Sequence, residues 1–518
     1  MKRLLYVVHG FLFAAIAPII HYMMIAGDRV YESPGRLVQP IILAVVLYLI
    51  LIASAAIVFR NLENAGVLAS LLVLAFFYLW PIFDSVLIAL VVGAVLLGLA
   101  ARRFEMLHIH LVLDVCSVLL TGYYLFLFLS NLSSQPLQNY AHLVSPVAGP
   151  QSSQITAQDR PDIYYIILDA YGRADMLQQI YGFDNSAFIQ GLEQRGFVVP
   201  PLSRSNYPRT ILSLSSSLNM QYLDGARQVL GNSELWWPLE APLQNSQVRL
   251  FLEAQGYRTV FFATHFDETD IRNGNYYEKP YALMPDNLEE TFIGETNLDL
   301  FSDPLSNVMF HSSVESFRKT ILFDLETLPK VADIPGPKFV FMHIISPHPP
   351  FLFNANGPIS FKKNAIVSIG DGQGFGGTAS DYRIGYTGQV QFLDPQVLNM
   401  IDALLARSSQ KPIIIIQGDH GPGMFLNYSS ADDTCIYERF SILNAYYFPG
   451  VDPASVPADI SPVDTFRFVF NHYFGAHFDL LPSVQYFSAE PGPFQFEDVT
   501  DQYQPNQPTC SLPQSSTP

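Results

Sequence analysis

The chain has 518 residues, of which 49% are hydrophobic and only 14% are charged, whereas soluble proteins carry roughly 25% charged residues. This composition argues against an entirely soluble, an entirely disordered or a collagen-like protein. The formal net charge of −18 argues against a nucleic-acid partner, because nucleic-acid binding needs a basic surface. Three cysteines are too few for a disulfide scaffold or a Cys-rich zinc module.

Hydrophobic residues are concentrated near the amino terminus, where five apolar runs follow one another. A membrane-spanning helix needs about 20 apolar residues. The runs are Leu4–Gly27, Leu37–Phe59, Asn64–Phe83, Ser85–Ala101 and Leu111–Ser130. A single run of this kind could be a buried helix of a soluble protein. The succession of runs instead predicts a transmembrane domain of about five helices over residues 1–130.

The positive charges between these runs predict the orientation in the membrane, because Lys and Arg are enriched on the cytoplasmic side. Those expected inside are Lys2, Arg3, Arg60, Arg102 and Arg103, and those expected outside are Arg29 and Arg36. We therefore expect a multi-pass protein of the plasma or inner membrane, with a cytoplasmic amino terminus and everything after Ser130 outside. Three polar residues in the runs, His9, His21 and Asp114, are expected to make contacts between helices.

The rest of the chain is polar and acidic. Residues 1–130 carry a net charge of +1, so the remainder carries −19. Residues 131–160 are rich in Ser, Gln and Pro and are typical of a linker. Residues 161–497 are long enough for one large α/β domain with its own core, and residues 498–518 are expected to be an irregular tail.

Short strand-like runs alternate with helical patterns in this domain. The predicted strands are DIYYIILD (162–169), YRTVFFAT (257–264), KFVFMHII (338–345) and PIIIIQGD (412–419), and helices are predicted over 186–195 and 393–407. Continuous apolar strands separated by helices predict a largely parallel sheet with helices on both faces. In such sheets, functional sites gather at the carboxyl ends of the strands.

Three of these strands end in residues that can bind a metal ion or exchange protons. The first ends in Asp169, the third continues past His343 to His348, and the last ends in Asp419 and His420. Carboxylates and imidazoles are ligands of Zn²⁺ and similar ions. Each residue alone could equally cap a helix or a turn. Together they indicate a metal site.

A further candidate lies in the segment Ser205-Asn206-Tyr207-Pro208-Arg209-Thr210. Thr210 follows a loop with proline and opens a predicted helix, a position that favours anions. Its hydroxyl could be a nucleophile if a cation activates it. The alternative is that Thr210 only caps the helix.

Taken together, these residues resemble the alkaline phosphatase superfamily in its sulfatase-like branch, over about Pro161 to Phe487. The order is similar: an acidic ligand after a strand, a hydroxyl nucleophile, a histidine before a Pro-rich turn and a late Gly-Asp-His-Gly motif. The membrane domain also resembles lipoteichoic acid synthases and, more loosely, phosphoethanolamine transferases. The resemblance implies one divalent ion, manganese or zinc, and leaves a second ion open. By position, its ligands would be Asp169, Thr210, Asp419 and His420, with His348 as a catalytic residue.

Two looser matches to the family are His265, after a strand-like segment, and Arg272, where a phosphate-binding arginine would follow. The chain also departs from the pattern. Thr210 lacks the context that sulfatases need to form formylglycine, and Asp169 stands where the synthases have Glu. The glycine-rich segment 370–377 follows no clear strand and opens no helix, so we expect a loop near the site rather than a nucleotide loop.

The function expected from these features is an outward-facing, metal-dependent phosphotransferase or phosphodiesterase with a Thr nucleophile, acting on a lipid head group or a surface glycan. One alternative is a sulfatase on the same fold, and another is a catalytically inactive envelope scaffold. Cys435 and Cys510 are the only thiols outside the predicted membrane domain, and they could form a disulfide in an oxidising exterior. The sequence leaves the oligomeric state open.

Overall fold

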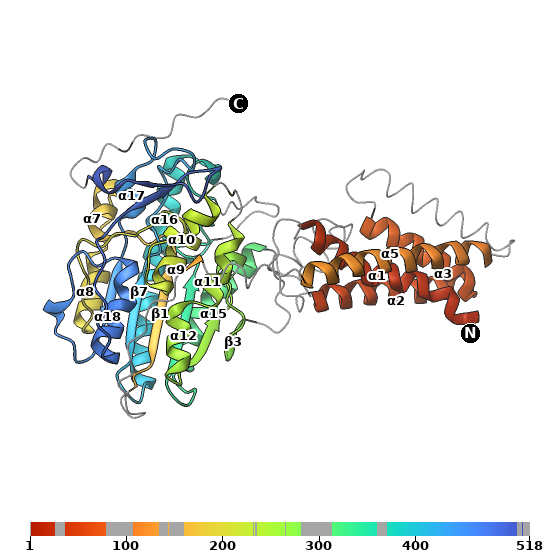
Figure 1. The fold of residues 1–518 in the computed structure, drawn as a ribbon, viewed down its shortest axis with the longest axis horizontal. Helices are drawn as coiled ribbons and strands as arrows, with labels where there is room; N and C mark the ends of the chain where they lie inside the picture. The colour runs from red at the N-terminus through yellow and green to blue at the C-terminus, as the bar shows by residue number, and fades with distance from the viewer. Residues whose placement is uncertain are drawn as a thin grey trace. The chain divides into compact units, whose positions relative to one another are not determined.

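The computed structural model describes residues 2–25, 37–78, 107–133, 143–144, 160–231, 233, 236–264, 266–280, 313–359, 370–504 and 510. These residues fall into two compact units, an amino-terminal helical unit and a second unit that contains the described residues from 143 onward. Figure 1 shows the ribbon of both units.

The first unit contains four described helices, which are α1 (Lys2–Ile25), α2 (Val38–Phe59), α3 (Leu62–Tyr78) and α5 (Leu107–Ser133). In three of them, the windows Tyr6–Met23, Pro40–Phe59 and His108–Ser130 are long and apolar enough to cross a membrane. Helix α3 is apolar but shorter. The predicted run Ser85–Ala101 lies outside the described residues, so the count of five spans stays a prediction.

Polar side chains in this unit connect its helices. His9 Nδ1 lies 2.6 Å from the Ser70 hydroxyl, and His9 Nε2 lies 2.7 Å from His110 Nδ1. The other ring nitrogen of His110 lies 3.0 Å from the carbonyl oxygen of Glu63. These contacts join α1 with α3 and α5, and His21 in α1 lies 3.2 Å from a carbonyl oxygen of α3. Both histidines predicted to make contacts between helices therefore do so.

The second unit is built on a six-stranded sheet with the order β3-β2-β4-β1-β7-β8. Its strands are β1 (Ile163–Leu168), β2 (Arg258–Phe262), β3 (Tyr276–Glu278), β4 (Lys338–Ile344), β7 (Ile413–Gln417) and β8 (Asn444–Tyr447). All neighbouring pairs are parallel except β7 and β8. The largely parallel sheet expected from the sequence is confirmed, and β8 adds an antiparallel edge.

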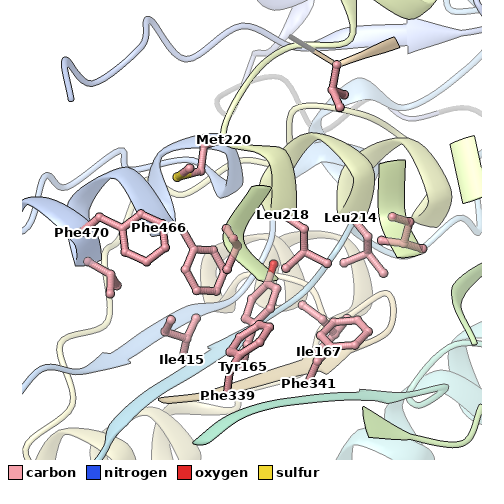
Figure 2. Packing of buried hydrophobic residues seen from close by; sticks show 14 of the residues in the cluster. Tyr165, Ile167, Leu214, Leu218, Met220, Phe339, Phe341, Ile415, Phe466 and Phe470 are labelled. Atoms are coloured by element: carbon pink, nitrogen blue, oxygen red, sulfur yellow. The ribbon is translucent and has the colours of Figure 1, made fainter. Parts of the chain in front are cut away.

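Two hydrophobic cores cover the two faces of the sheet because side chains alternate along each strand. In β1, Tyr165 and Ile167 lie in one core, and Tyr164 and Ile166 lie in the other. Figure 2 shows the first core, where Leu214 and Leu218 of a covering helix lie over Tyr165 and Phe341 of the sheet.

The helices divide between these faces. Those packed in the first core are α9 (Thr210–Asn219), α10 (Asp224–Leu230), α11 (Glu240–Gln244), α12 (Gln247–Ala254) and α18 (Pro462–Phe474). Those packed in the second are α7 (Ala174–Met176), α8 (Ser186–Gln194), α15 (Ser313–Val331), α16 (Ala379–Arg407) and α17 (Ile436–Phe440). Two short hairpins pair β5 (Phe353–Asn354) with β6 (Gly357–Pro358) and β9 (Tyr486–Ser488) with β10 (Phe496–Asp498).

Two features of the second unit differ from what the sequence predicts. Helix α16 begins at Ala379 rather than near residue 393, because Thr378 and Asp381 form a capping box at its start. Leu143 and Val144, in the segment predicted to be a linker, are buried in the first core. Cys435 and Cys510, in contrast, form the disulfide that the sequence analysis considered, and it attaches Cys510 to the start of α17.

Asp324 in α15 is a buried carboxylate whose two oxygens have no hydrogen-bond partner among the described residues. Burial raises the pKa of Asp324 well above its ordinary value. The carboxyl group is then protonated in the folded state at pH values where the unfolded chain has already lost this proton. Stability must therefore fall as the pH rises from the unfolded pKa toward the folded pKa, by up to about 1.4 kcal/mol per pH unit.

We expect Asp324→Asn to remove this loss, because the amide cannot ionise. The difference in unfolding free energy between variant and wild type should therefore grow in favour of the variant from pH 5 to pH 8 in urea titrations. A difference that does not change with pH would contradict the assignment of a neutral Asp324.

Candidate active site

The candidate site lies where β1, β4 and β7 end side by side. Asp169 directly follows β1, His348 follows β4 after a short turn, and Asp419 and His420 follow β7. Because β4 and β7 both pair with β1 in parallel, their carboxyl ends lie on one edge of the sheet. The backbone N–H of His348 donates to the carbonyl oxygen of Asp169 over 3.0 Å. The predicted convergence of the strand ends is therefore present.

The two oxygens of Asp169 have different surroundings. Oδ2 lies 3.1 Å from His343 Nε2, and the other ring nitrogen of His343 lies 2.9 Å from the Thr269 hydroxyl. Oδ1 is buried and has no hydrogen-bond partner among the described residues. Burial alone would raise the pKa of Asp169, but the nearby charges of His348 and His343 lower it to about 2. Asp169 is therefore an ionised carboxylate with one oxygen available to a ligand.

Asp419, like Asp169, has one hydrogen-bonded carboxylate oxygen and one without a partner among the described residues. Its Oδ1 accepts a hydrogen bond from the N–H of Ala170 over 3.0 Å, and its carbonyl oxygen accepts one from the Ser213 hydroxyl over 2.7 Å. Its Oδ2 is buried without a hydrogen-bond partner among the described residues. Ser213 belongs to α9, so this contact fixes Asp419 relative to the helix that Thr210 begins.

His420 presents one ring nitrogen to three oxygens. Its Nδ1 lies 2.9 Å from the Gly421 carbonyl oxygen, so Nδ1 carries the proton and donates it. Burial, reinforced by the Arg439 charge, lowers the pKa of His420, which favours the neutral ring with a lone pair on Nε2. Nε2 lies 3.2 Å from Thr210 Oγ1, 3.3 Å from Asp419 Oδ2 and 3.7 Å from Asp169 Oδ1.

This arrangement fits a divalent cation. A lone pair and two carboxylate oxygens without hydrogen-bond donors lie close together, and a cation would satisfy all three. Among the described residues, two groups have ligand atoms within 4.8 Å of one another, namely Asp169 with His348 and His420, and Asp169 with His343 and Asp419. Oxygen and imidazole ligands suit Zn²⁺ and Mn²⁺.

Thr210 borders a pocket of about 160 Å³ beside this cluster. The residue is the first of α9 and is 7% exposed. The other described residues that line it are Arg209, Ile211, Trp236, Phe266, Glu268, His348, His420, Tyr428 and Arg439. A helix amino terminus and two arginines on the wall favour an anionic ligand.

Asp371 is a site residue that the sequence analysis missed, because it lies in the glycine-rich segment 370–377. Its Oδ2 lies 3.3 Å from His348 Nε2 and 2.6 Å from Arg439 Nη1. Burial alone would lower the pKa of His348, but the Asp371 and Asp169 carboxylates outweigh it and raise this pKa to about 10. The segment therefore holds His348 protonated beside the pocket.

Gly423 and Arg439 complete the surroundings of Asp371. A Cβ atom on Gly423 would lie 2.8 Å from Asp371 Oδ2, so only glycine fits at this point after the Asp419-His420 pair. Arg439, in α17, also donates to the carbonyl oxygens of Pro208 and Gly421 over 2.7 and 2.9 Å. Arg439 thus fixes the loop that leads to Thr210 and the loop that contains His420.

A protein-family model described as Sulfatase matches residues 161–473. The chain belongs to the sulfatase family. This assignment places it in the alkaline phosphatase superfamily, as expected from the sequence, and makes it an enzyme of phosphate or sulfate esters. None of the curated protein sequences compared with the chain matches it.

Solved structures of this superfamily align with this sulfatase-family chain at low similarity. The periplasmic domain of EptC from Escherichia coli, in a complex with Zn, is 12% identical with a TM-score of 0.46, over 71% of this chain and 99% of that one. The phosphoethanolamine transferase EptA from Neisseria meningitidis is 12% identical with a TM-score of 0.42, over 90% and 95%. An alkaline phosphatase superfamily protein from Vibrio parahaemolyticus is 12% identical with a TM-score of 0.41, over 68% and 80%. The family assignment rests on the family model alone.

Of the two residues expected to bind substrate by their looser match to the family, the structure describes only Arg272. His265 lies outside the described residues. Arg272 forms an ion pair with Asp270 at 2.7 Å, and its guanidinium lies 5.9 Å from the Tyr277 ring centre. Arg272 is not among the residues that line the pocket. Its role in binding stays a prediction.

We expect Asp371→Asn to destabilise the protein and to lower activity. The substitution leaves the Arg439 guanidinium buried without a counter-charge, which costs about 3–5 kcal/mol, and it removes the carboxylate that holds His348 protonated. Asp394→Asn is a matched control, because burial raises the pKa of Asp394 to about 7 and its partner is the hydroxyl of Tyr171 at 2.6 Å. Urea titrations should show a clearly larger loss for Asp371→Asn, and equal losses would contradict the role of Asp371.

Proposed function

We propose that the protein is a membrane-anchored, metal-dependent phosphotransferase or phosphodiesterase that uses Thr210 as its nucleophile. The observation that carries this proposal is the position of the Thr210 hydroxyl, 3.2 Å from Nε2 of His420, the same ring nitrogen that faces two carboxylates with unpaired oxygens. We propose that its substrates are phosphate esters of lipid head groups or of surface glycans.

Asp169, Thr210, Asp419 and His420 would hold one divalent ion, manganese or zinc, and a second ion remains an open part of the proposal. The ion would favour the alkoxide form of Thr210 and neutralise negative charge on the ester. This neutralisation matters because the segment after residue 130 carries a net charge of −19, which repels an anionic substrate.

Three residues of the chain would act on the ester, namely Thr210, His348 and Arg439. Thr210 gives its hydroxyl proton to solvent, its oxygen attacks the phosphorus, and the bond to the leaving oxygen breaks as the Thr210 ester forms. His348, protonated at Nε2 beside Asp371, gives its proton to the leaving oxygen. Arg439 Nη2 makes no hydrogen bond to a described residue although the side chain is 3% exposed and borders the pocket, so it is available to an ester oxygen. Water or an acceptor alcohol then releases the group from Thr210.

Hydrolysis of sulfate esters is the second candidate, and the description of the family model favours it. Phosphate and sulfate esters are both tetrahedral anions. Sulfatases need a Cys or Ser that is converted to formylglycine, however, and this chain has Thr210 in that role. We therefore place phosphate transfer first.

The test is an assay of the purified full-length protein, with manganese or zinc, on matched aryl phosphate, aryl phosphodiester and aryl sulfate. We expect turnover of one or both phosphate esters and little turnover of the sulfate. Turnover of the sulfate alone would favour the sulfatase. No turnover or product formation on any ester, with the metal bound, would favour the inactive scaffold.

We further propose that the amino terminus is cytoplasmic and that the second unit lies outside the membrane. The excess of Lys and Arg on one side of the predicted spans supports this orientation. Reporter fusions after Arg103 and after Arg160 should then report opposite sides of the membrane. Two cytoplasmic reports would contradict the orientation and would remove access to envelope substrates.

A further inference from the structure

Arg209 precedes Thr210 and lies on the wall of the same pocket. Its side chain is 16% exposed. The centre of its guanidinium lies 4.7 Å from the ring centre of Trp236 and 4.6 Å from that of Tyr428. Stacking on aromatic faces holds the plane of the guanidinium and leaves its N–H edge for acceptors. The geometry therefore holds the N–H donors of Arg209 in fixed positions on the wall of the pocket that Thr210 also borders.

The charge of Arg209 has weak compensation within the chain. Its Nη2 lies 3.0 Å from Glu490 Oε1, and the Glu490 side chain is 49% exposed, so solvent screens this pair. No other hydrogen bond joins the Arg209 side chain to a described residue. Arg439 differs, because it forms a buried ion pair with Asp371 at 2.6 Å. A largely buried cation with a weak partner is costly unless a ligand supplies an anion.

The two arginines thus offer two separate anion contacts. Arg439 lies close to His348 and Asp371, on the side of the transferred group. Arg209 contacts the rings of Trp236 and Tyr428, and its hydrogen bond goes to Glu490 rather than to Asp169 or Asp419. Among the described residues that line the pocket, Glu268 alone is acidic. The pocket wall therefore favours a second negative charge over a positive one.

We propose that Arg209 is a specificity residue that binds a second anionic group, a carboxylate or a second phosphate, close to the transferred phosphoryl group of the donor. This inference rests on the proposed function and names its donor class as esters with two anionic groups. A planar guanidinium binds either anion through two parallel hydrogen bonds.

The test compares three small phosphate monoesters of similar size as competitors of aryl phosphate turnover by the full-length protein with its metal. They are phosphoglycolate, with a second anion, ethylene glycol monophosphate, with a neutral end, and O-phosphoethanolamine, with a cationic end. We expect phosphoglycolate to bind roughly tenfold more tightly than ethylene glycol monophosphate, and O-phosphoethanolamine to bind most weakly. Isothermal calorimetry gives the same ranking without turnover.

Arg209→Met should lower the affinity for phosphoglycolate about tenfold more than the affinity for ethylene glycol monophosphate and so remove the preference, and Arg209→Lys should keep part of the preference. Arg195→Met is the matched control, because Arg195 pairs with Asp402 at 2.5 Å and does not line the pocket. It should keep the wild-type ranking.

An equal ranking of the three esters by the wild type, or tightest binding of O-phosphoethanolamine, would overturn the inference even if the Arg209 variants do not fold. A preference that survives in a folded Arg209→Met would also overturn it. Failure of all three phosphate esters to bind would overturn the inference, and absent turnover of both the aryl phosphate and the aryl phosphodiester would in addition overturn the proposed function on which it rests.

Discussion

Thr210→Ala should reduce turnover of the preferred aryl ester by roughly 10⁴-fold or more, since loss of a catalytic nucleophile has effects of this size. We propose that Thr210 is both a metal ligand and the nucleophile, and alanine can be neither. Folding should be nearly unchanged, because the hydroxyl has a single hydrogen-bond partner among the described residues, His420 Nε2, and removal of such a group costs about 1 kcal/mol. Steady-state kinetics and urea titrations of the purified protein measure both effects.

Two variants of the same helix serve as controls. Thr210→Ser keeps the hydroxyl and should retain measurable activity. Ser215→Ala removes a hydroxyl of α9 that contacts the Leu239 carbonyl oxygen at 3.4 Å and does not line the pocket, so it should turn over like the wild type. Wild-type turnover by Thr210→Ala would overturn the mechanism.

The second large effect is expected for the double variant Asp419→Ala, His420→Ala, which should lose both its metal and its activity. The variant removes one of the two carboxylates with an unpaired oxygen and the ring nitrogen that faces both of them. Of the proposed ligands, only Asp169 and the Thr210 hydroxyl would then remain. These are too few ligands for tight binding of zinc.

Metal content after dialysis against a weak chelator, with circular dichroism as the check on folding, measures this effect. Asp432→Ala, Asp433→Ala removes two carboxylates from another part of the unit and should keep the metal. A double variant of Asp419 and His420 that retains stoichiometric metal would contradict the site.

The sequence predicted the parallel sheet and the residues at the strand ends, because both depend on local patterns. Apolar runs such as 162–169 and 412–419 mark buried strands, and a parallel sheet brings their carboxyl ends to one edge. Asp169, His348, Asp419 and His420 therefore lie together as expected. Thr210 was identified by its place before a helix, and its contact with His420 follows from the packing of α9 on the sheet.

The remaining site residues could not be predicted in this way, because only tertiary contacts give them a role. Asp371 lies in a glycine-rich segment without periodicity, and Arg439 lies in a five-residue helix. In the sequence, nothing distinguishes Arg209 from other arginines in loops, because its contacts with Trp236 and Tyr428 appear only in the folded chain. The sequence did contain one signal for Asp371. It is the only carboxylate in the glycine-rich segment 370–377, which was expected near the site, and a protonated His348 needs a counter-charge. His343 was visible in its strand, but its contact with Asp169 was not.

Covalent catalysis by Thr210 can be tested by acid quenching of the enzyme during turnover. The quenched full-length protein is digested, and the peptide that contains Thr210 is sequenced by mass spectrometry. We expect one phosphoryl group on Thr210 in the presence of substrate and metal, and none in Asp419→Ala, His420→Ala. An unmodified Thr210 in an enzyme that is turning over, under conditions where release of the group is slowed, would rule out covalent catalysis by Thr210.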